Sequence, residues 1–192
     1  MIKRRARIYD ALALLVVAII VGVDQWTKAL VVEHLSPYDT GPRIHLIGQY
    51  LLLFYIRNNG AAFSLFANSA VLIGLIIIAV GVICYIYARM INSGSLAIKL
   101  IMGMIVGGAL GNIFDRVRHA GYVVDFIAFR IPQINFYFAI FNIADAAISV
   151  GVFLFFVALL TSSFRHPRNT ADVKPSAQKQ DDPVGNQQRG TP

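Results

Sequence analysis

Four long apolar segments constrain the fold of this 192-residue chain more than any other feature. They cover residues 11–32, 70–88, 96–114 and 138–160. Each is close to the roughly 20 residues that an α-helix needs to cross a hydrocarbon core of about 30 Å. Helices are expected because lipid cannot satisfy the polar groups of an open backbone. The sequence therefore predicts an all-α membrane protein with four transmembrane helices.

The composition agrees with this prediction. The chain is 57% hydrophobic and only 14% charged, whereas a soluble domain carries about 25% charged residues. The formal net charge is +7. However, the basic residues gather at the chain ends and in short gaps between the apolar segments, which is typical of membrane orientation signals. We therefore expect membrane lipid, and no nucleic acid, as a partner.

The basic residues also predict the orientation of the chain. They precede the first segment, flank the turn between the second and third, and follow the fourth: Lys3, Arg4, Arg5, Arg7, Arg89, Lys99, Arg165 and Arg168. With four spans these three regions share one side, which the positive-inside rule assigns to the cytoplasm. Both termini are then cytoplasmic. A cleavable signal peptide is disfavoured because the first apolar run continues beyond Lys28 and no A-x-A motif closes it.

The segments outside the spans differ in character. Residues 33–69 contain two runs of branched and aromatic residues, at 44–47 and 50–56, which predict two short strands in a β-rich extracytoplasmic cradle. Residues 117–137 form a second short outer segment, where we expect Pro132 to break any regular element. Residues 165–192 are too polar to bury a core and predict a disordered cytoplasmic tail. Residues 1–164 then form one membrane domain.

Polar residues occur inside the apolar segments, and their depths agree. Asp24 and Lys28 are four residues apart, so they share a helix face in the outer leaflet and can neutralise each other. Gly108, Asn112 and Arg116 form one stripe at the outer end of the third segment. Ionisable residues at such depths are costly and are candidates for function.

Two further acids lie near the same membrane face. Asn142 and Asp145 are three residues apart at the outer end of the fourth segment, and Asp125 lies in the outer segment before it. If Asp125 folds back over Asp145, the two carboxyl groups would share a proton and could act as general acid and base. Spacing alone leaves three interpretations open: peptide hydrolysis, structural bracing of the helices, and conduction of an ion or substrate.

Other chemistries are disfavoured by the sequence. Cys84 is the only cysteine, the four histidines are scattered without HExxH spacing, and no G-x-S-x-G motif occurs. Thiolate and histidine metal sites need more ligands than this. We therefore expect no metal and no cofactor.

Four sequence blocks resemble the lipoprotein signal peptidases, the signal peptidase II family. They are Asp24-Gln25-Trp26-Thr27-Lys28; Asn58-Asn59-Gly60-Ala61-Ala62-Phe63; residues 107–116 continuing through Gly121-Tyr122-Val123-Val124-Asp125-Phe126; and Phe141-Asn142-Ile143-Ala144-Asp145. The resemblance covers most of the chain, from residue 24 to residue 149. No single block is specific, but all four occur in order in a chain with four predicted spans.

The resemblance implies a function and a set of site residues. It implies an aspartyl endopeptidase of the bacterial inner membrane that cleaves diacylglyceryl-modified prolipoproteins just before the modified cysteine, near the outer face. Asp125 and Asp145 would be the catalytic dyad. Supporting or substrate-contacting roles would fall to Asp24, Lys28, Asn58, Gly60, Gly108, Asn112, Arg116 and Asn142. We expect the enzyme to be monomeric.

Overall fold

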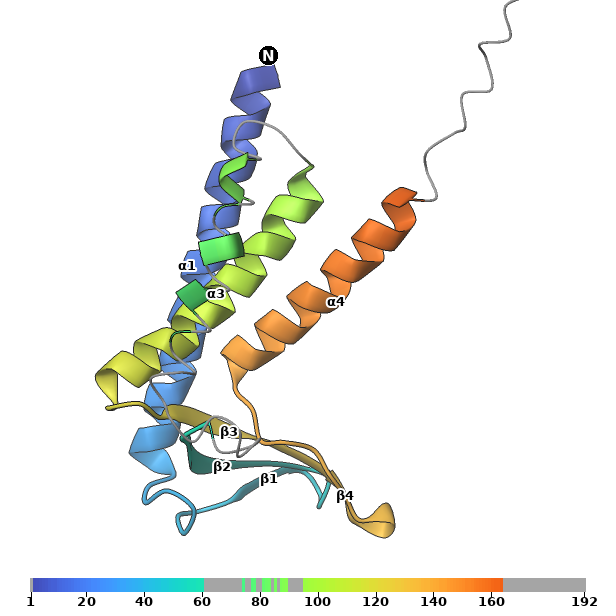
Figure 1. Ribbon diagram of the computed structural model, residues 1–192. Helices are drawn as coiled ribbons and strands as arrows, with labels where there is room; N and C mark the ends of the chain where they lie inside the picture. Colours follow the sequence, from blue (N-terminus) through green and yellow to red (C-terminus); the bar gives the residue numbers. More distant parts are fainter. Residues whose placement is uncertain are drawn as a thin grey trace, which may run out of the picture.

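The computed structural model describes residues 2–60, 74, 77–78, 81–83, 85, 87–89 and 95–163. Its long helices lie together and a small sheet closes one end of them (Figure 1). The helices are α1 (Ile2–His34), α3 (Leu96–Arg118) and α4 (Ile143–Ser163). The strands are β1 (Ile44–Ile47), β2 (Leu51–Asn58), β3 (Val123–Ile131) and β4 (Phe136–Tyr137), with a short 3-10 helix η2 (Pro132–Ile134) between the last two.

Three helices in the described part of the chain are long and apolar enough to cross a membrane. The qualifying stretches are Ala6–His34, Leu96–Arg118 and Ile143–Thr161. The second predicted span, residues 70–88, lies mostly outside the described residues, although those described within it are helical. The predicted tail, residues 165–192, and Cys84 lie wholly outside them.

The bounds of α1, α3 and α4 differ from those of the corresponding predicted spans. Helix α1 extends beyond residues 11–32 at both ends, and α3 continues past residue 114 to Arg118. Helix α4 begins at Ile143 rather than at residue 138. The reason is that the preceding residues are extended and pair with β3: Phe136 and Tyr137 form β4, and Phe141 exchanges backbone hydrogen bonds with Ile127. Apolar content marked this stretch as a span, whereas strand pairing excludes its backbone from the helix.

The sheet is antiparallel in the order β1-β2-β3-β4. Two strands in the first outer segment are confirmed, with the second displaced to Leu51–Asn58. The second outer segment supplies the nine-residue strand β3, which was not predicted from the sequence, and the expected break at Pro132 is confirmed. Pro132 ends this strand and starts η2. The two outer segments therefore build one sheet.

The register between β2 and β3 places two polar side chains together. Asn58 pairs with Val123, and Ile56 pairs with Asp125. Since side chains two residues apart on a strand share a face, Asn58 and Asp125 are diagonal neighbours on one face of the sheet. An apolar cluster fixes the sheet to the end of α1, and it consists of Val31, Leu35, Tyr55, Val124 and Phe126.

Small residues on α3 allow the helices to approach closely. A Cβ atom at Gly108 would lie 2.4 Å from the carbonyl oxygen of Ala144 on α4. A Cβ atom at Gly111 would lie 2.7 Å from a carboxylate oxygen of Asp24 on α1. Glycine is therefore required where α3 meets both of its neighbours, as is common between helices packed in membranes.

Gly108→Ala is expected to lower stability, because the added methyl group meets backbone and must separate α3 from α4. Overpacking of this kind costs roughly 1–3 kcal/mol. Gly22→Ala is the matched control, since nothing lies within 4 Å of a Cβ atom at that α1 position. Thermal unfolding in detergent measures both variants. Equal melting temperatures for the two would contradict the packing interpretation.

Candidate active site

The first turn of α4 is built around Asn142 and Asp145. Asn142 Oδ1 accepts a hydrogen bond from the backbone N–H of Asp145 (2.9 Å), and Asp145 Oδ2 accepts one from the backbone N–H of Asn142 (3.2 Å). This reciprocal arrangement is a capping box, which satisfies N–H groups that a helix start would otherwise leave unpaired. The spacing predicted that these two residues share a face. The cap additionally fixes the Asp145 carboxyl group at the helix N-terminus, where negative charge is stabilised.

Asp125 reaches the same place from β3 and is only 1% exposed. Its Oδ1 accepts a hydrogen bond from Asn142 Nδ2 (2.6 Å), and its Oδ2 accepts one from Asn58 Nδ2 (2.8 Å). The amide of Asn58 is oriented in turn, because its Oδ1 accepts the backbone N–H of Gly60 (2.8 Å). Gly60 has a φ of +81°, a conformation that favours glycine.

Asn142 therefore joins Asp125 to Asp145. We call these two acids the carboxyl pair. The side-chain amide of Asn142 donates to the first acid and its backbone N–H donates to the second. The pKa of Asp125 is raised to about 7, chiefly by burial and next by the negative charge of Asp145, against the hydrogen bonds from Asn58 and Asn142. An acid whose pKa lies near 7, beside a second acid, can hold a proton near neutral pH, which suits general acid–base chemistry.

A buried ionic cluster lies behind the carboxyl pair. Lys28 Nζ lies 2.8 Å from Asp24 Oδ2 and 3.0 Å from Asp115 Oδ2, and it donates to Asn112 Oδ1 (3.1 Å). Lys28 is 3% exposed and both acids are fully buried. The predicted i, i+4 pair of Asp24 and Lys28 is thus present. Asn112 also extends to the carboxyl pair, because its Nδ2 donates to Asp145 Oδ1 (2.7 Å).

The cluster is tied to α1, α3 and α4 and to the sheet. Asp24 Oδ1 accepts the backbone N–H of Ala144 in α4 (3.0 Å), and Asp115 Oδ2 accepts that of Val124 in β3 (3.0 Å). Gln25 Nε2 bridges the two acids, with contacts of 3.1 Å to Asp24 and 2.8 Å to Asp115.

Two other predicted site residues lie on the same stripe of α3. Gly108 packs against the backbone of Ala144, and Arg116 Nη1 donates to the backbone carbonyl of Asn112 (3.3 Å). All ten sequence-predicted residues thus lie in or beside one polar cluster at the sheet end of the helices.

Sequence reasoning missed Asp115 and Gln25 as individual site residues. Asp115 was visible as a charge three residues after Asn112 at the end of an apolar segment. In the structure its cationic partner is Lys28 of α1, which lies 87 positions earlier in the chain. Within the described ranges, no three His, Cys, Asp or Glu side chains gather in a way that could hold a metal ion.

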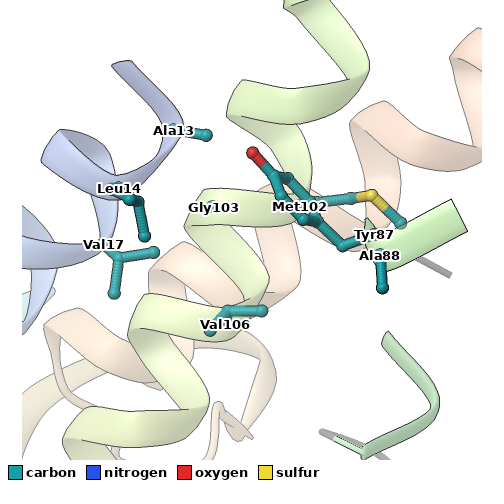
Figure 2. A pocket seen from close by; sticks show the side chains of 8 residues that line it. All are labelled: Ala13, Leu14, Val17, Tyr87, Ala88, Met102, Gly103 and Val106. Carbon is teal, nitrogen blue, oxygen red and sulfur yellow. The ribbon is translucent and has the colours of Figure 1, made fainter. Parts of the chain in front are cut away.

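Two of the cavities lined by described residues border the helices, and they differ in chemistry. One, of about 200 Å³, lies between α1 and α3 and is almost wholly apolar (Figure 2). Its lining is Ala13, Leu14, Val17, Tyr87, Ala88, Met102, Gly103 and Val106. The other, of about 230 Å³, borders Gln25, Lys28 and Asp115. Only the second touches the polar cluster, so the first contributes no group to the carboxyl pair.

Comparison with known proteins places the chain in a family. The family model for signal peptidase (SPase) II matches residues 16–161. A lipoprotein signal peptidase of Mesorhizobium japonicum is 41% identical over 165 residues, covering 85% of this chain and 93% of that protein. One of Caldanaerobacter subterraneus subsp. tengcongensis is 38% identical over 143 residues, covering 74% and 92%.

A solved structure described as a bacterial membrane enzyme superposes with a TM-score of 0.71. It is 29% identical in sequence, and the match covers 82% of this chain and 93% of that one. A second structure with the same description gives a TM-score of 0.67 at 31% identity. The sequence match and the shared fold agree, and this chain belongs to the signal peptidase II family.

Proposed function

We propose that the protein is a membrane aspartyl endopeptidase that removes signal peptides from prolipoproteins, cutting just before a cysteine that carries a diacylglyceryl group. The family match and the relatives named lipoprotein signal peptidase support the peptidase activity and the class of substrate. The observation that carries the aspartyl mechanism is the carboxyl pair, in which Asn142 links Asp125 to Asp145.

The proposed reaction uses water and the two carboxyl groups alone. The ionised carboxylate takes a proton from water while the water oxygen bonds to the scissile carbonyl carbon. The protonated carboxyl group donates its proton to the carbonyl oxygen, and a tetrahedral intermediate forms. When that intermediate collapses, the carbon–nitrogen bond breaks, the leaving nitrogen receives a proton from one carboxyl group, and a hydroxyl group of the intermediate returns a proton to the other. Two acids in different environments are suited to these opposite roles.

The neighbouring amides keep the pair ready for this chemistry. Asn58, Asn112 and Asn142 donate to its oxygens without adding charge. Each carboxyl group therefore retains an orientation in the absence of substrate. Such preorganisation removes a reorientation step from the reaction.

The proposed location is the bacterial inner membrane, with four spans and both termini in the cytoplasm. Residues 70–88 would supply the remaining span and residues 165–192 the tail outside the 1–164 domain. The positive-inside pattern supports this orientation. The carboxyl pair lies at the sheet end of the helices, so this orientation puts it near the outer face, where water and the acyl chains of a substrate meet (Figure 1). We propose that the enzyme acts as a monomer.

Activity should depend on the lipid attached to the substrate. The purified protein is expected to cleave a diacylglyceryl-modified prolipoprotein and to leave the unmodified precursor intact, because only the modified cysteine carries acyl chains that partition into the bilayer. Gel mobility and mass spectrometry of the products identify the cut site. Equal cleavage of both precursors would contradict the proposed specificity.

Asp125→Asn and Asp145→Asn should each abolish cleavage while preserving membrane insertion. General acid–base groups contribute about 10²–10⁴-fold to rate, so a loss of at least roughly 100-fold is expected. Asp39→Asn, on an exposed loop, is the matched control. A conducting protein would instead show ion flux in liposomes that depends on Asp145, and a scaffold would lose only stability. Retained proteolysis in both variants would refute the acid pair.

The pH–rate profile should fall on its basic side near pH 7, where Asp125 loses its proton. Asn58→Ala removes a donor that lowers the pKa of this acid. Loss of the Asn58 hydrogen bond therefore raises the pKa of Asp125, and the basic limb of the kcat/KM profile should move to higher pH. Initial cleavage rates from pH 5 to 9 measure the limb, and a shift to lower pH would show that the assignment to Asp125 is wrong.

A further inference from the structure

The amide of Asn112 is held from both sides, by Lys28 behind it and by Asp145 in front. Lys28 Nζ donates to its Oδ1 at 3.1 Å, and its Nδ2 donates to Asp145 Oδ1 at 2.7 Å. An ammonium group has donors only. The amide oxygen must therefore face Lys28, which turns the N–H₂ group toward Asp145.

Asn142 cannot replace Lys28 in this role. Its Nδ2 lies 3.2 Å from Asn112 Oδ1, but it also lies 2.6 Å from Asp125 Oδ1 and 3.4 Å from the carbonyl oxygen of Val124. An amide nitrogen has two hydrogens for these three acceptors, and the shortest contact is to Asp125. The donor that orients Asn112 is thus Lys28.

Lys28 is also connected, through its carboxylate partners, to the backbone just before Asp125 and Asp145. Its two carboxylate partners accept the N–H groups of Ala144 and Val124, which immediately precede Asp145 and Asp125. The three donors of the ammonium group are matched by three acceptors: Asp24, Asp115 and Asn112. The group is therefore fully paired, and its position determines that of all three partners.

We propose that Lys28 is a positioning residue for the cleavage reaction, which holds both members of the carboxyl pair in place through Asn112, Asp24 and Asp115. The inference rests on the proposed function of the pair. It assigns to Lys28 a role beyond neutralising Asp24, because the same ammonium group controls an amide that contacts a reacting acid.

Removing the ammonium group should lower kcat and leave KM little changed, because Lys28 is 3% exposed and its ammonium group is paired with Asp24, Asp115 and Asn112. Lys28→Met keeps the length of the side chain and removes its donors. Loss of an oriented hydrogen bond to a charged group predicts a decrease of about 10–100-fold in kcat. Asn112→Ala and the double variant Lys28→Met/Asn112→Ala complete a double-mutant cycle. If Lys28 acts through Asn112, adding Lys28→Met to Asn112→Ala should cost little more, whereas multiplied losses would overturn that route.

The pH profile supplies a second readout. The charged groups of the described part that act on the carboxyl pair are Asp24 and Lys28 on α1 and Arg116 on α3, and Asp115 lies behind them as a partner of Lys28. The positive charge of Lys28 lowers the pKa of Asp125. In Lys28→Met that pKa therefore rises, and the basic limb should move to higher pH. An unchanged limb would count against the proposal.

Lys28→Met leaves two buried carboxylates without their cation, so it can fail to fold. Lys28→Met/Asp115→Asn removes one charge of each sign and preserves the net charge of the cluster, and its amide can still accept the N–H of Val124. If Lys28 only stabilises the bundle, this variant regains the wild-type kcat, and the proposal is overturned. If Lys28 positions Asn112, kcat stays low in a folded protein.

A second ion pair, in which Lys99 is buried and Asp10 is 20% exposed, provides the control. Lys99 on α3 contacts Asp10 on α1, joining the same two helices at the end remote from the sheet. Asp10→Asn/Lys99→Met should change thermal stability and leave kcat and the pH profile as in the wild type. Loss of activity in Asp125→Asn with a normal Lys28→Met would refute this inference alone, whereas full activity in both Asp→Asn variants of the pair would refute the proposed function itself.

Discussion

The contact between Asp24 and the first turn of α4 determines the arrangement of the other polar groups. The carboxylate of this α1 residue accepts the backbone N–H of Ala144, and it can reach that position because Gly111 of the intervening helix has no side chain. Helix N-termini attract negative charge, so the contact stabilises both partners. This contact fixes the position of α4 along the axis of α1. Because Asp145 directly follows Ala144, it also fixes the position of Asp145.

The remaining polar groups satisfy one another around that contact. Burying a carboxylate or an ammonium group is costly unless it is paired and hydrogen-bonded. Here one cation serves two carboxylates, and Gln25 bridges the same two acids. The two acids of the carboxyl pair, by contrast, receive neutral amide donors. The site thus separates a neutralised ionic cluster from a pair of acids whose charge state remains free to change.

Local spacing predicted the helical part of this site. The i, i+4 relation of Asp24 and Lys28 and the i, i+3 relation of Asn142 and Asp145 are properties of a single helix, so they could be derived from sequence alone. The common depth of Asp24, Asn112 and Asp145 followed from alternating span directions. Contacts of Lys28 with Asn112 and Asp115 depend on how two helices rotate against each other, and no single segment encodes that rotation.

The sheet was less accessible to sequence reasoning. Strand β3 pairs with β2, and 67 positions separate Asn58 from Asp125 in the sequence. The hydrophobic pattern of a strand does not indicate which other strand it pairs with. The residues before α4 were assigned to a span because they are aromatic and apolar, although they are extended beside β3. Tertiary pairing overrode composition in both places.

The two acids are carried by different elements: one by a long apolar helix and the other by a strand of the sheet that caps the helices. The distance between the two acids therefore depends on how the sheet packs against the helices, and neither element sets it alone. A ligand that lifts the cap, even one that touches neither carboxyl group, would uncouple them. Asn142 can bond to both acids only while the sheet is packed against the helices.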